Sequence, residues 1–124
     1  MHLQKLRPEF TVCQAEDFSE ISFADEFLFL GKTDEEISVV CRTELVPKNT
    51  IQREDGWKAY RIAGTLEFSL VGILADIARC LADAGVSIFA VSTYNTDYIL
   101  VKKESEKNAD DALRNAGHEI TECE

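Results

Sequence analysis

Long apolar runs, clustered positive charges and closely spaced cysteines are all missing from this chain. No stretch of about 18 apolar residues occurs, which excludes a membrane-spanning helix. The segment from Met1 to Lys5 has no apolar core of the kind a signal peptide needs, so we expect a cytoplasmic protein. Lys and Arg number 13 against 23 Asp and Glu, giving a formal net charge of −10. Because the few basic residues are scattered, we expect neither a nucleic-acid nor a membrane partner.

Patterns for metal binding and catalysis are absent as well. The four cysteines lie far apart, at Cys13, Cys41, Cys80 and Cys123. None belongs to the Cys-x-x-Cys pairs of structural zinc sites, so we expect reduced thiols that pack as small hydrophobes. The histidines, His2 and His118, are isolated. Without a phosphate-binding loop or a nucleophile beside a base, we expect no catalytic residue, no metal and no cofactor.

The second half of the chain has the clearest hydrophobic periodicity. Apolar residues at every second position predict strands, and apolar residues spaced by three and four positions predict helices. These patterns predict six elements: strand 58–63, helix 70–81, strand 86–94, strand 97–103, helix 105–116 and strand 118–123. Ser69 is the expected N-cap of the first helix, and Gly85 and Gly117 the expected terminators of the two helices. This order predicts an α+β, ferredoxin-like βαββαβ fold, with both helices on one face of a four-stranded antiparallel sheet.

The first half is less regular. Its patterns predict strands at 9–14, 26–30 and 36–41, one helical turn at 42–45 and a polar loop at 49–56. An apolar strand, Thr-Asp and a second apolar strand occur at Thr33-Asp34 and again at Thr96-Asp97. We interpret this as a degenerate internal repeat whose first copy, at 1–56, has lost most of its first helix, followed by a complete unit at 57–124. Two small units side by side would supplement each other's marginal cores.

Gly72 is the first residue that suggests a ligand. It lies near the start of the first helix, where Gly is unfavourable by about 1 kcal/mol relative to Ala. Unpaired N–H groups and the positive end of the helix dipole favour a carboxylate there, and Gly would let the backbone approach that anion closely. The alternative is that Gly72 merely packs against a neighbouring strand.

The segment Ser92 to Asp97 is the second candidate. It gathers hydroxyls, an amide and a carboxylate around one turn, and such groups can hold an ammonium ion by charge-assisted hydrogen bonds. The alternative is ordinary turn chemistry, because Asn, Thr and Asp are common turn formers.

The tract FSLVGILADIARCLADAGVSIFAVSTYNTDYILVK resembles the signature of the ACT domain family. Together with TDEEISVVC, ELVP and GWKAYRI in the first half, it is similar to small tandem-ACT proteins related to the CASTOR arginine sensors. The resemblance implies a complete ACT domain at 57–124 and a degenerate ACT-like unit at 1–56. It also implies a ligand site with two sides. One side is a cradle for the ligand's carboxylate, formed by Ser69, Leu70, Val71 and Gly72. The opposite wall is formed by Thr93, Tyr94 and Asp97.

ACT domains commonly bind amino acids at interfaces between paired domains and control an enzyme rather than catalyse. The resemblance therefore implies a non-catalytic, amino-acid-binding regulatory protein that forms a homodimer and acts on an unidentified enzyme. Two alternatives stay open. One is an assembly module without a ligand, and the other is a small enzyme of ferredoxin-like fold, such as an acylphosphatase.

Overall fold

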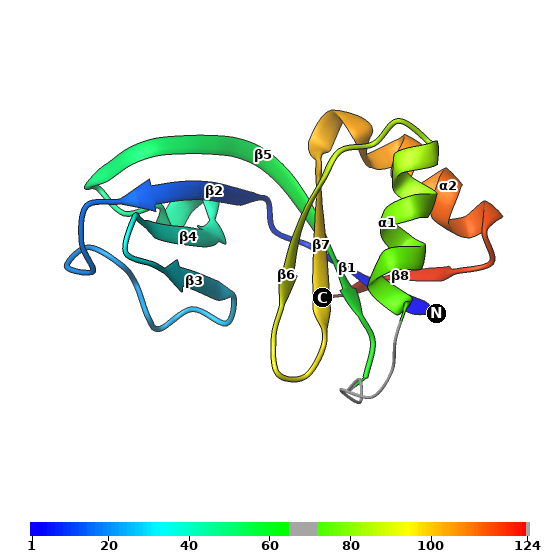
Figure 1. Ribbon diagram of the computed structural model, residues 1–124, viewed down its shortest axis with the longest axis horizontal. Coiled ribbons are helices and arrows are strands. Elements are labelled where there is room, and N and C mark those ends of the chain that lie inside the picture. The colour runs from blue at the N-terminus through cyan, green and yellow to red at the C-terminus, as the bar shows by residue number, and fades with distance from the viewer. Residues whose placement is uncertain (65–71, 124) are drawn as a thin grey trace. The chain divides into compact units, whose positions relative to one another are not determined.

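The computed structural model describes residues 1–64 and 72–123, which form two compact units (Figure 1). The inserted unit is Pro8–Trp57. The split unit combines Met1–Arg7 with Lys58–Glu124. Residues 1–7, which the prediction placed with the first unit, thus group with the C-terminal part of the chain. Among the described residues, no helix is both long and apolar enough to cross a membrane.

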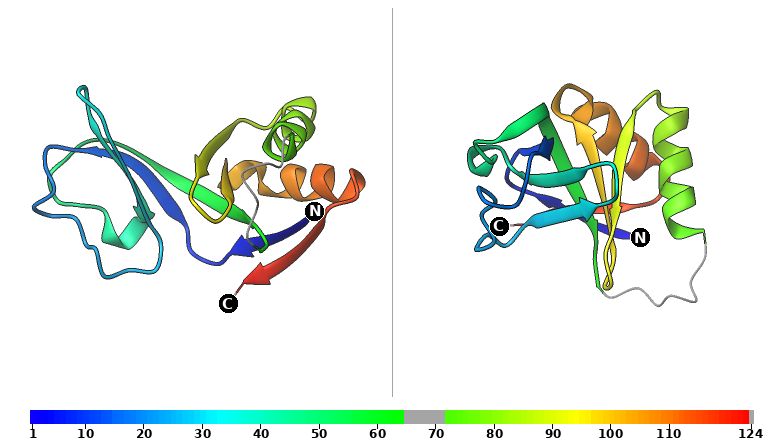
Figure 2. Two further views of the ribbon diagram at one scale, coloured as in Figure 1. Left: turned by 60° about the horizontal axis from the view of Figure 1, so that its bottom comes forward. Right: turned by 60° about the vertical axis from the view of Figure 1, so that its left-hand side comes forward.

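The split unit is a mixed sheet covered on one face by two helices (Figures 1 and 2). Its described strands lie in the order β6-β7-β5-β1-β8. The elements are β1 (His2–Leu6), β5 (Thr50–Ile62, from Lys58 on), α1 (Ile73–Asp83), β6 (Ile88–Ser92), β7 (Asp97–Lys102), the 3-10 turn η2 (Lys103–Ser105), α2 (Glu106–Asn115) and β8 (Glu119–Cys123). The six predicted elements of the second half are thereby confirmed in type and order, and both helices end just before the predicted glycines.

Strand β1 corrects the predicted four-stranded antiparallel sheet. It lies between the first and last strands of the βαββαβ unit, antiparallel to β5 and parallel to β8, so that Leu3 is opposite both Ile62 and Ile120. The sequence gives little sign of this strand because its core-facing side includes a charged residue, Lys5, next to Leu3. A buried lysine breaks the apolar alternation by which strands are recognised.

The core of the split unit joins both helices to the sheet. Its buried members are Leu3, Tyr60, Ile62, Ile77, Leu81, Val86, Ile99, Val101, Ala109 and Leu113. Each helix contributes two of them at a spacing of four residues, which places one apolar stripe per helix against the strands.

The inserted unit has the strand order β3-β4-β2-β5, with every pair antiparallel. Its elements are β2 (Phe10–Ala15), β3 (Leu28–Lys32), β4 (Ile37–Arg42), the 3-10 turn η1 (Thr43–Leu45) and the first part of β5, from Thr50. The predicted polar loop at 49–56 is wrong, because residues 50–56 are strand. Most of their side chains are exposed, and so polar residues dominate this stretch.

The two units repeat one fold, and the inserted unit is the reduced copy. The starts of β3, β4 and η1 each lie 60 residues before those of β6, β7 and η2. The burial patterns of β4 and β7 are identical. In the inserted unit, residues 16–27 replace the first helix, and Ile21 fills the core against Cys13 and Val39. The fold is therefore a tandem of ferredoxin-type units, as predicted.

The offset between the repeats corrects the proposed match of their turns. At 60 residues, Thr33 corresponds to Thr93 and not to Thr96. The backbone N–H of Thr33 donates to Glu36 O at 3.0 Å, and that of Thr93 donates to Thr96 O at 2.9 Å. The two turns thus share a hydrogen bond and a leading threonine, three residues away from the match based on Thr-Asp.

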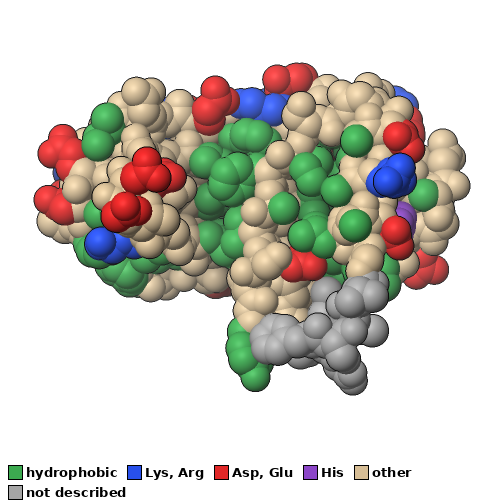
Figure 3. Space-filling model, viewed as in Figure 1, with side chains coloured by type: hydrophobic (Ala, Val, Ile, Leu, Met, Phe, Trp, Pro, Cys, Tyr) green, Lys and Arg blue, Asp and Glu red, His purple; other side chains and the backbone are tan. Residues whose placement is uncertain are grey.

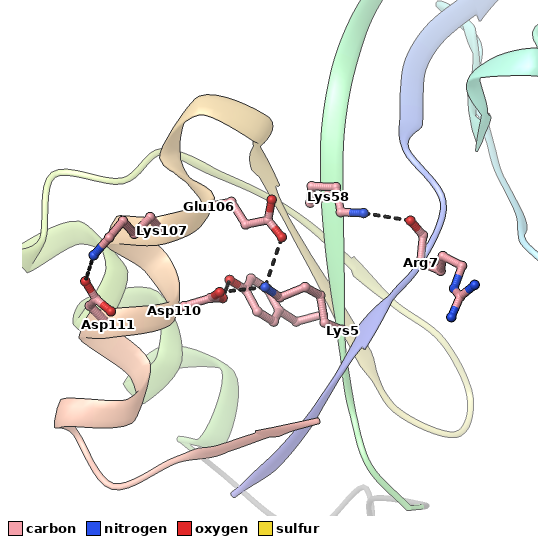
Figure 4. A network of polar contacts seen from close by, with 8 residues as sticks. Lys5, Arg7, Lys58, Glu106, Lys107, Asp110 and Asp111 are labelled. Atoms are coloured by element: carbon pink, nitrogen blue, oxygen red, sulfur yellow. Dashed lines mark hydrogen bonds and ion pairs between the residues drawn. The ribbon is translucent and has the colours of Figure 1, made fainter. Parts of the chain in front are cut away.

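A buried lysine joins β1 to α2 (Figure 4). Lys5 is 6% exposed, and its Nζ lies 2.9 Å from Glu106 Oε2 and 2.5 Å from Asp110 Oδ2. Tyr60, opposite Lys5 in the β1–β5 ladder, donates its hydroxyl to the other oxygen of Asp110. Burial opposes the charge on Lys5, but hydrogen bonds and attraction from the two carboxylates outweigh it and raise the pKa of Lys5. Burial and the bond to Asp110 also raise the pKa of Tyr60.

Replacing the buried lysine should cost much more stability than replacing an exposed one. Lys5→Met leaves two carboxylates without their counter-ion, so we expect the free energy of unfolding in urea to fall by about 3 kcal/mol. The matched control is Lys107→Met, which removes an exposed ion pair to Asp111 on the same helix and should change stability by less than about 0.5 kcal/mol. Equal effects of the two substitutions would contradict a structural role for the buried pair.

The effect of Lys5→Met should shrink in alkali. A raised folded-state pKa gives a contribution that is complete below the ordinary value, 10.5 for Lys5 and 10.0 for Tyr60, and is lost as the pH rises through the folded pKa. In urea unfolding, we therefore expect the stability difference between the wild type and Lys5→Met to be constant below about pH 10.5 and to shrink between about pH 10.5 and about pH 12. A stability difference that stays constant over this range would contradict the assignment.

Candidate functional site

The two halves of the predicted ligand site lie at the same end of the split unit. In Figures 1 and 2 the N-terminus of α1 and the turn between β6 and β7 are at one end of the sheet. Three residues of the predicted cradle, Ser69, Leu70 and Val71, lie outside the described residues. Gly72 and the opposite wall are described, so the geometry below concerns these.

Gly72 is the N-cap of α1, which begins at Ile73. This corrects the predicted Ser69 cap and places Gly72 before the helix rather than within its first turn. Its φ is +84°, in the left-handed region that glycine enters without strain. A Cβ built on Gly72 would have no non-adjacent heavy atom within 4 Å, so packing against a strand does not explain the residue. The left-handed backbone conformation favours glycine here.

The start of α1 offers backbone donors. The first helical hydrogen bond runs from Asp76 N to Gly72 O at 2.8 Å, so the N–H groups of residues 73–75 precede the intrahelical ladder. Gly72 has no side chain that could cap them. Together with the helix dipole, these donors give a partial positive charge that suits a carboxylate. The carboxylate of Asp76 in the first turn reduces that charge.

The β6–β7 turn is held by its own threonines. The Oγ1 of Thr93 donates to Thr96 O at 2.8 Å and accepts from Thr96 N at 3.3 Å. Thr96 is buried, and its hydroxyl donates to Ile62 O on β5 at 2.8 Å. Thr93 therefore serves the turn, as the alternative interpretation held, and its hydroxyl is already engaged. Thr96 fixes the turn to the sheet, a role that its type alone did not reveal.

Tyr94 and Asp97 are the other two residues of this predicted wall. Tyr94 is 79% exposed, the largest exposure among the large hydrophobic side chains that the structure describes. Asp97 begins β7 opposite Ser92 and is partly exposed. Their assignment to a ligand site stays a prediction.

The inserted unit has a pocket of about 340 Å³ at the position that matches this site in the repeat. It lies at the end of β2 and under the β3–β4 turn, and its lining residues are Gln14, Ala15, Glu16, Lys32, Thr33, Asp34, Glu35, Glu36, Ile37 and Ile51. Four carboxylates against one lysine make it acidic. Within residues 1–64 and 72–123, no group of His, Cys, Asp and Glu is arranged to bind a metal ion.

Removing the Thr93 hydroxyl should loosen the turn. Thr93→Val keeps the shape of the side chain but loses both hydrogen bonds, so we expect a loss of about 1 kcal/mol in the free energy of unfolding. Thr93→Ser retains the hydroxyl and should restore most of this loss. If chemical denaturation shows the valine and serine variants to be equally stable, the hydroxyl does not hold the turn.

Comparisons with known proteins find the same fold in solved structures. A protein from Agobacterium tumefaciens, Atu0741, is 25% identical, covers 99% of this chain and 93% of its own, and superposes with a TM-score of 0.86. VC0802 from Vibrio cholerae, described as a possible transport protein, is 20% identical over 90% of this chain and 85% of its own, with a TM-score of 0.74. The regulatory subunit of aspartate kinase from Thermus thermophilus is 10% identical, covers 93% of this chain and 96% of its own, and has a TM-score of 0.63.

Among proteins with curated annotation, none matches the sequence. The profile of one family does match, and it covers residues 52–115, more than half of the chain. These residues include Gly72 and the β6–β7 turn described above. The chain belongs to the ACT domain family.

Proposed function

We propose that this protein is a non-catalytic regulator that binds a free amino acid and acts as a homodimer. The observation that carries the proposal is that Gly72 and the β6–β7 turn lie at the same end of the split unit. Backbone donors at the start of α1 suit the carboxylate of an amino acid. Asp97, across the same end, offers a carboxylate to its ammonium group or to a basic side chain.

Membership of the ACT family supports a small-molecule ligand, because the family commonly binds amino acids. The likeness to a separate regulatory subunit of aspartate kinase supports control of an enzyme on another chain. Within the proposal, Ser69, Leu70, Val71 and Gly72 form the cradle, while Tyr94 and Asp97 form the wall and Thr93 shapes it. The resemblance to arginine sensors and the carboxylate of Asp97 make basic amino acids the first candidates.

A panel of free amino acids should contain at least one that stabilises the protein. At a hundredfold excess over its dissociation constant, a ligand contributes about 2.7 kcal/mol, which corresponds to a rise in melting temperature on the order of 10 °C for a chain of this size. Gly72→Asn should abolish the rise, because asparagine tolerates the left-handed backbone while its side chain occupies the cradle. Differential scanning fluorimetry with and without each amino acid provides the measurement.

The matched control is Gly85→Asn, the same substitution at a left-handed position beyond the other end of α1. This variant should respond to ligand like the wild type. Asp97→Asn keeps the size of the side chain and should weaken the response to basic amino acids more than to neutral ones. A ligand response that survives Gly72→Asn would place the site elsewhere.

An assembly module without a ligand is the second candidate. It is favoured by the engagement of Thr93 in the turn, which removes one hydroxyl from the predicted wall. If no amino acid shifts the melting temperature of the wild-type protein, this second function is preferred.

A further inference from the structure

Two cysteines on neighbouring strands lie on one face of the sheet in the inserted unit. Cys13 of β2 is opposite Val39 of β4, and Cys41 lies two residues further along β4. Because side chains two residues apart along a strand share a face, the two thiols are diagonal neighbours. Both belong to the core of this unit, where Cys13 is 5% and Cys41 3% exposed. Both are free thiols in this structure.

The two thiols differ in reactivity because they hydrogen-bond to each other. The bond from Cys41 to the sulfur of Cys13 lowers the pKa of the Cys13 thiol, and the charge of Arg53, opposite it on β5, adds to this effect. Burial and the carboxylate of Asp55 oppose the shift. The same hydrogen bond and burial raise the pKa of Cys41. Since a thiolate attacks and a thiol does not, Cys13 is the nucleophile of the pair.

The cover over this core is weakly held on one side. Residues 16–27, which replace the first helix, contain no helix or strand. Ile21 is the only residue of this described segment that is buried, and it belongs to the same core as the two thiols. Segments with few buried contacts open locally at a small cost in free energy. A small reagent therefore reaches the thiols without unfolding of the sheet.

The charge of the inserted unit favours an uncharged reagent. Between Pro8 and Trp57 there are 12 acidic and 4 basic residues. Figure 3 shows Asp and Glu side chains over this unit, at the left of the view. An anionic oxidant such as oxidised glutathione is repelled by this surface. Hydrogen peroxide is small and uncharged, so it approaches without this repulsion.

We propose that Cys13 and Cys41 form a reversible disulfide bond in response to hydrogen peroxide, a modification that goes beyond the proposed function and requires no amino-acid ligand. The Cys13 thiolate attacks one peroxide oxygen, the O–O bond breaks, and the leaving hydroxide takes a proton and becomes water. The Cys41 sulfur then attacks the sulfenic acid of Cys13, forming the S–S bond and releasing a second water with the Cys41 proton. Two thiols lose two electrons in all, and peroxide gains them.

The diagonal arrangement makes this bond reducible. Cα atoms of diagonal neighbours are about 7–8 Å apart in an ideal ladder, whereas disulfides usually join Cα atoms no more than about 6.8 Å apart. Strands β2 and β4 must therefore move together when the bond forms, and bonds formed at such a cost are readily reduced by thiol–disulfide exchange. The movement reaches the acidic pocket, because Ala15 and Ile37 line it and are the next residues on the same face.

Mass spectrometry of the full chain tests the proposal. The wild-type protein is treated with limiting hydrogen peroxide, its remaining thiols are alkylated, and the product is digested without reduction. We expect a cross-linked pair of peptides containing Cys13 and Cys41, and a fall in free thiols from four to two. Dithiothreitol should restore all four thiols.

Replacing each thiol should give a different result. In Cys41→Ser, oxidation should stop at the sulfenic acid of Cys13, which dimedone labels. In Cys13→Ser, oxidation of Cys41 should slow on the order of tenfold or more, because Cys41 stays protonated. The matched control is Cys80→Ser, at a more exposed cysteine on α1, which should form the cross-link at the wild-type rate. Circular dichroism checks that the three variants fold.

The wild-type protein alone can overturn the inference. If peroxide at a concentration that oxidises Cys80 yields no peptide pair joining Cys13 to Cys41, the two thiols do not form a modification site. Equal rates of Cys41 oxidation in the wild type and in a folded Cys13→Ser variant would contradict the assignment of Cys13 as the nucleophile.

Discussion

A buried lysine ammonium group needs carboxylates as counter-ions. In this protein that requirement connects the first strand to the last helix. Lys5 lies in β1, and its partners Glu106 and Asp110 lie a hundred or more residues later on α2. The same contact places β1 between β5 and β8, and Tyr60 completes it from the neighbouring strand. An uncharged residue at position 5 would pack against the sheet without selecting a partner. The charge specifies which helix face lies over β1.

That same charge explains where prediction from the sequence stopped. The elements from α1 to β8 follow from apolar periodicity, because their buried faces contain almost only hydrophobic residues. Strand β1 was missed because a buried charge interrupts its apolar side. The first part of β5 was missed for the opposite reason: its side chains are largely exposed, and Arg53, Glu54 and Asp55 give it the composition of a loop. Both strands depend on pairing with distant segments, which local patterns do not record.

The sequence singled out Gly72 and the β6–β7 turn, and the structure describes the local conformation of both. Gly72 stood out because glycine is unfavourable in a helix, and the structure shows a different reason for it, a left-handed N-cap. Thr93 was considered both as a ligand contact and as a turn residue, and its hydrogen bonds support the turn. The different roles of Thr93 and Thr96 depend on which hydroxyl faces β5, and side-chain type alone does not show this. That direction follows from the three-dimensional twist of the hairpin.

The split unit has a consequence for the order of synthesis. Strand β1 is synthesised before the other described strands of the split unit, whereas one of its neighbours in the sheet, β8, is synthesised after them. At a translation rate of about 5–20 residues per second, roughly 6–23 seconds separate the two strands. Until then, Leu3 and Lys5 have no completed sheet and no α2 to cover them. The nascent β1 strand therefore passes through a period in which chaperones or other unpaired strands can bind it, whereas the inserted unit is contiguous and already synthesised.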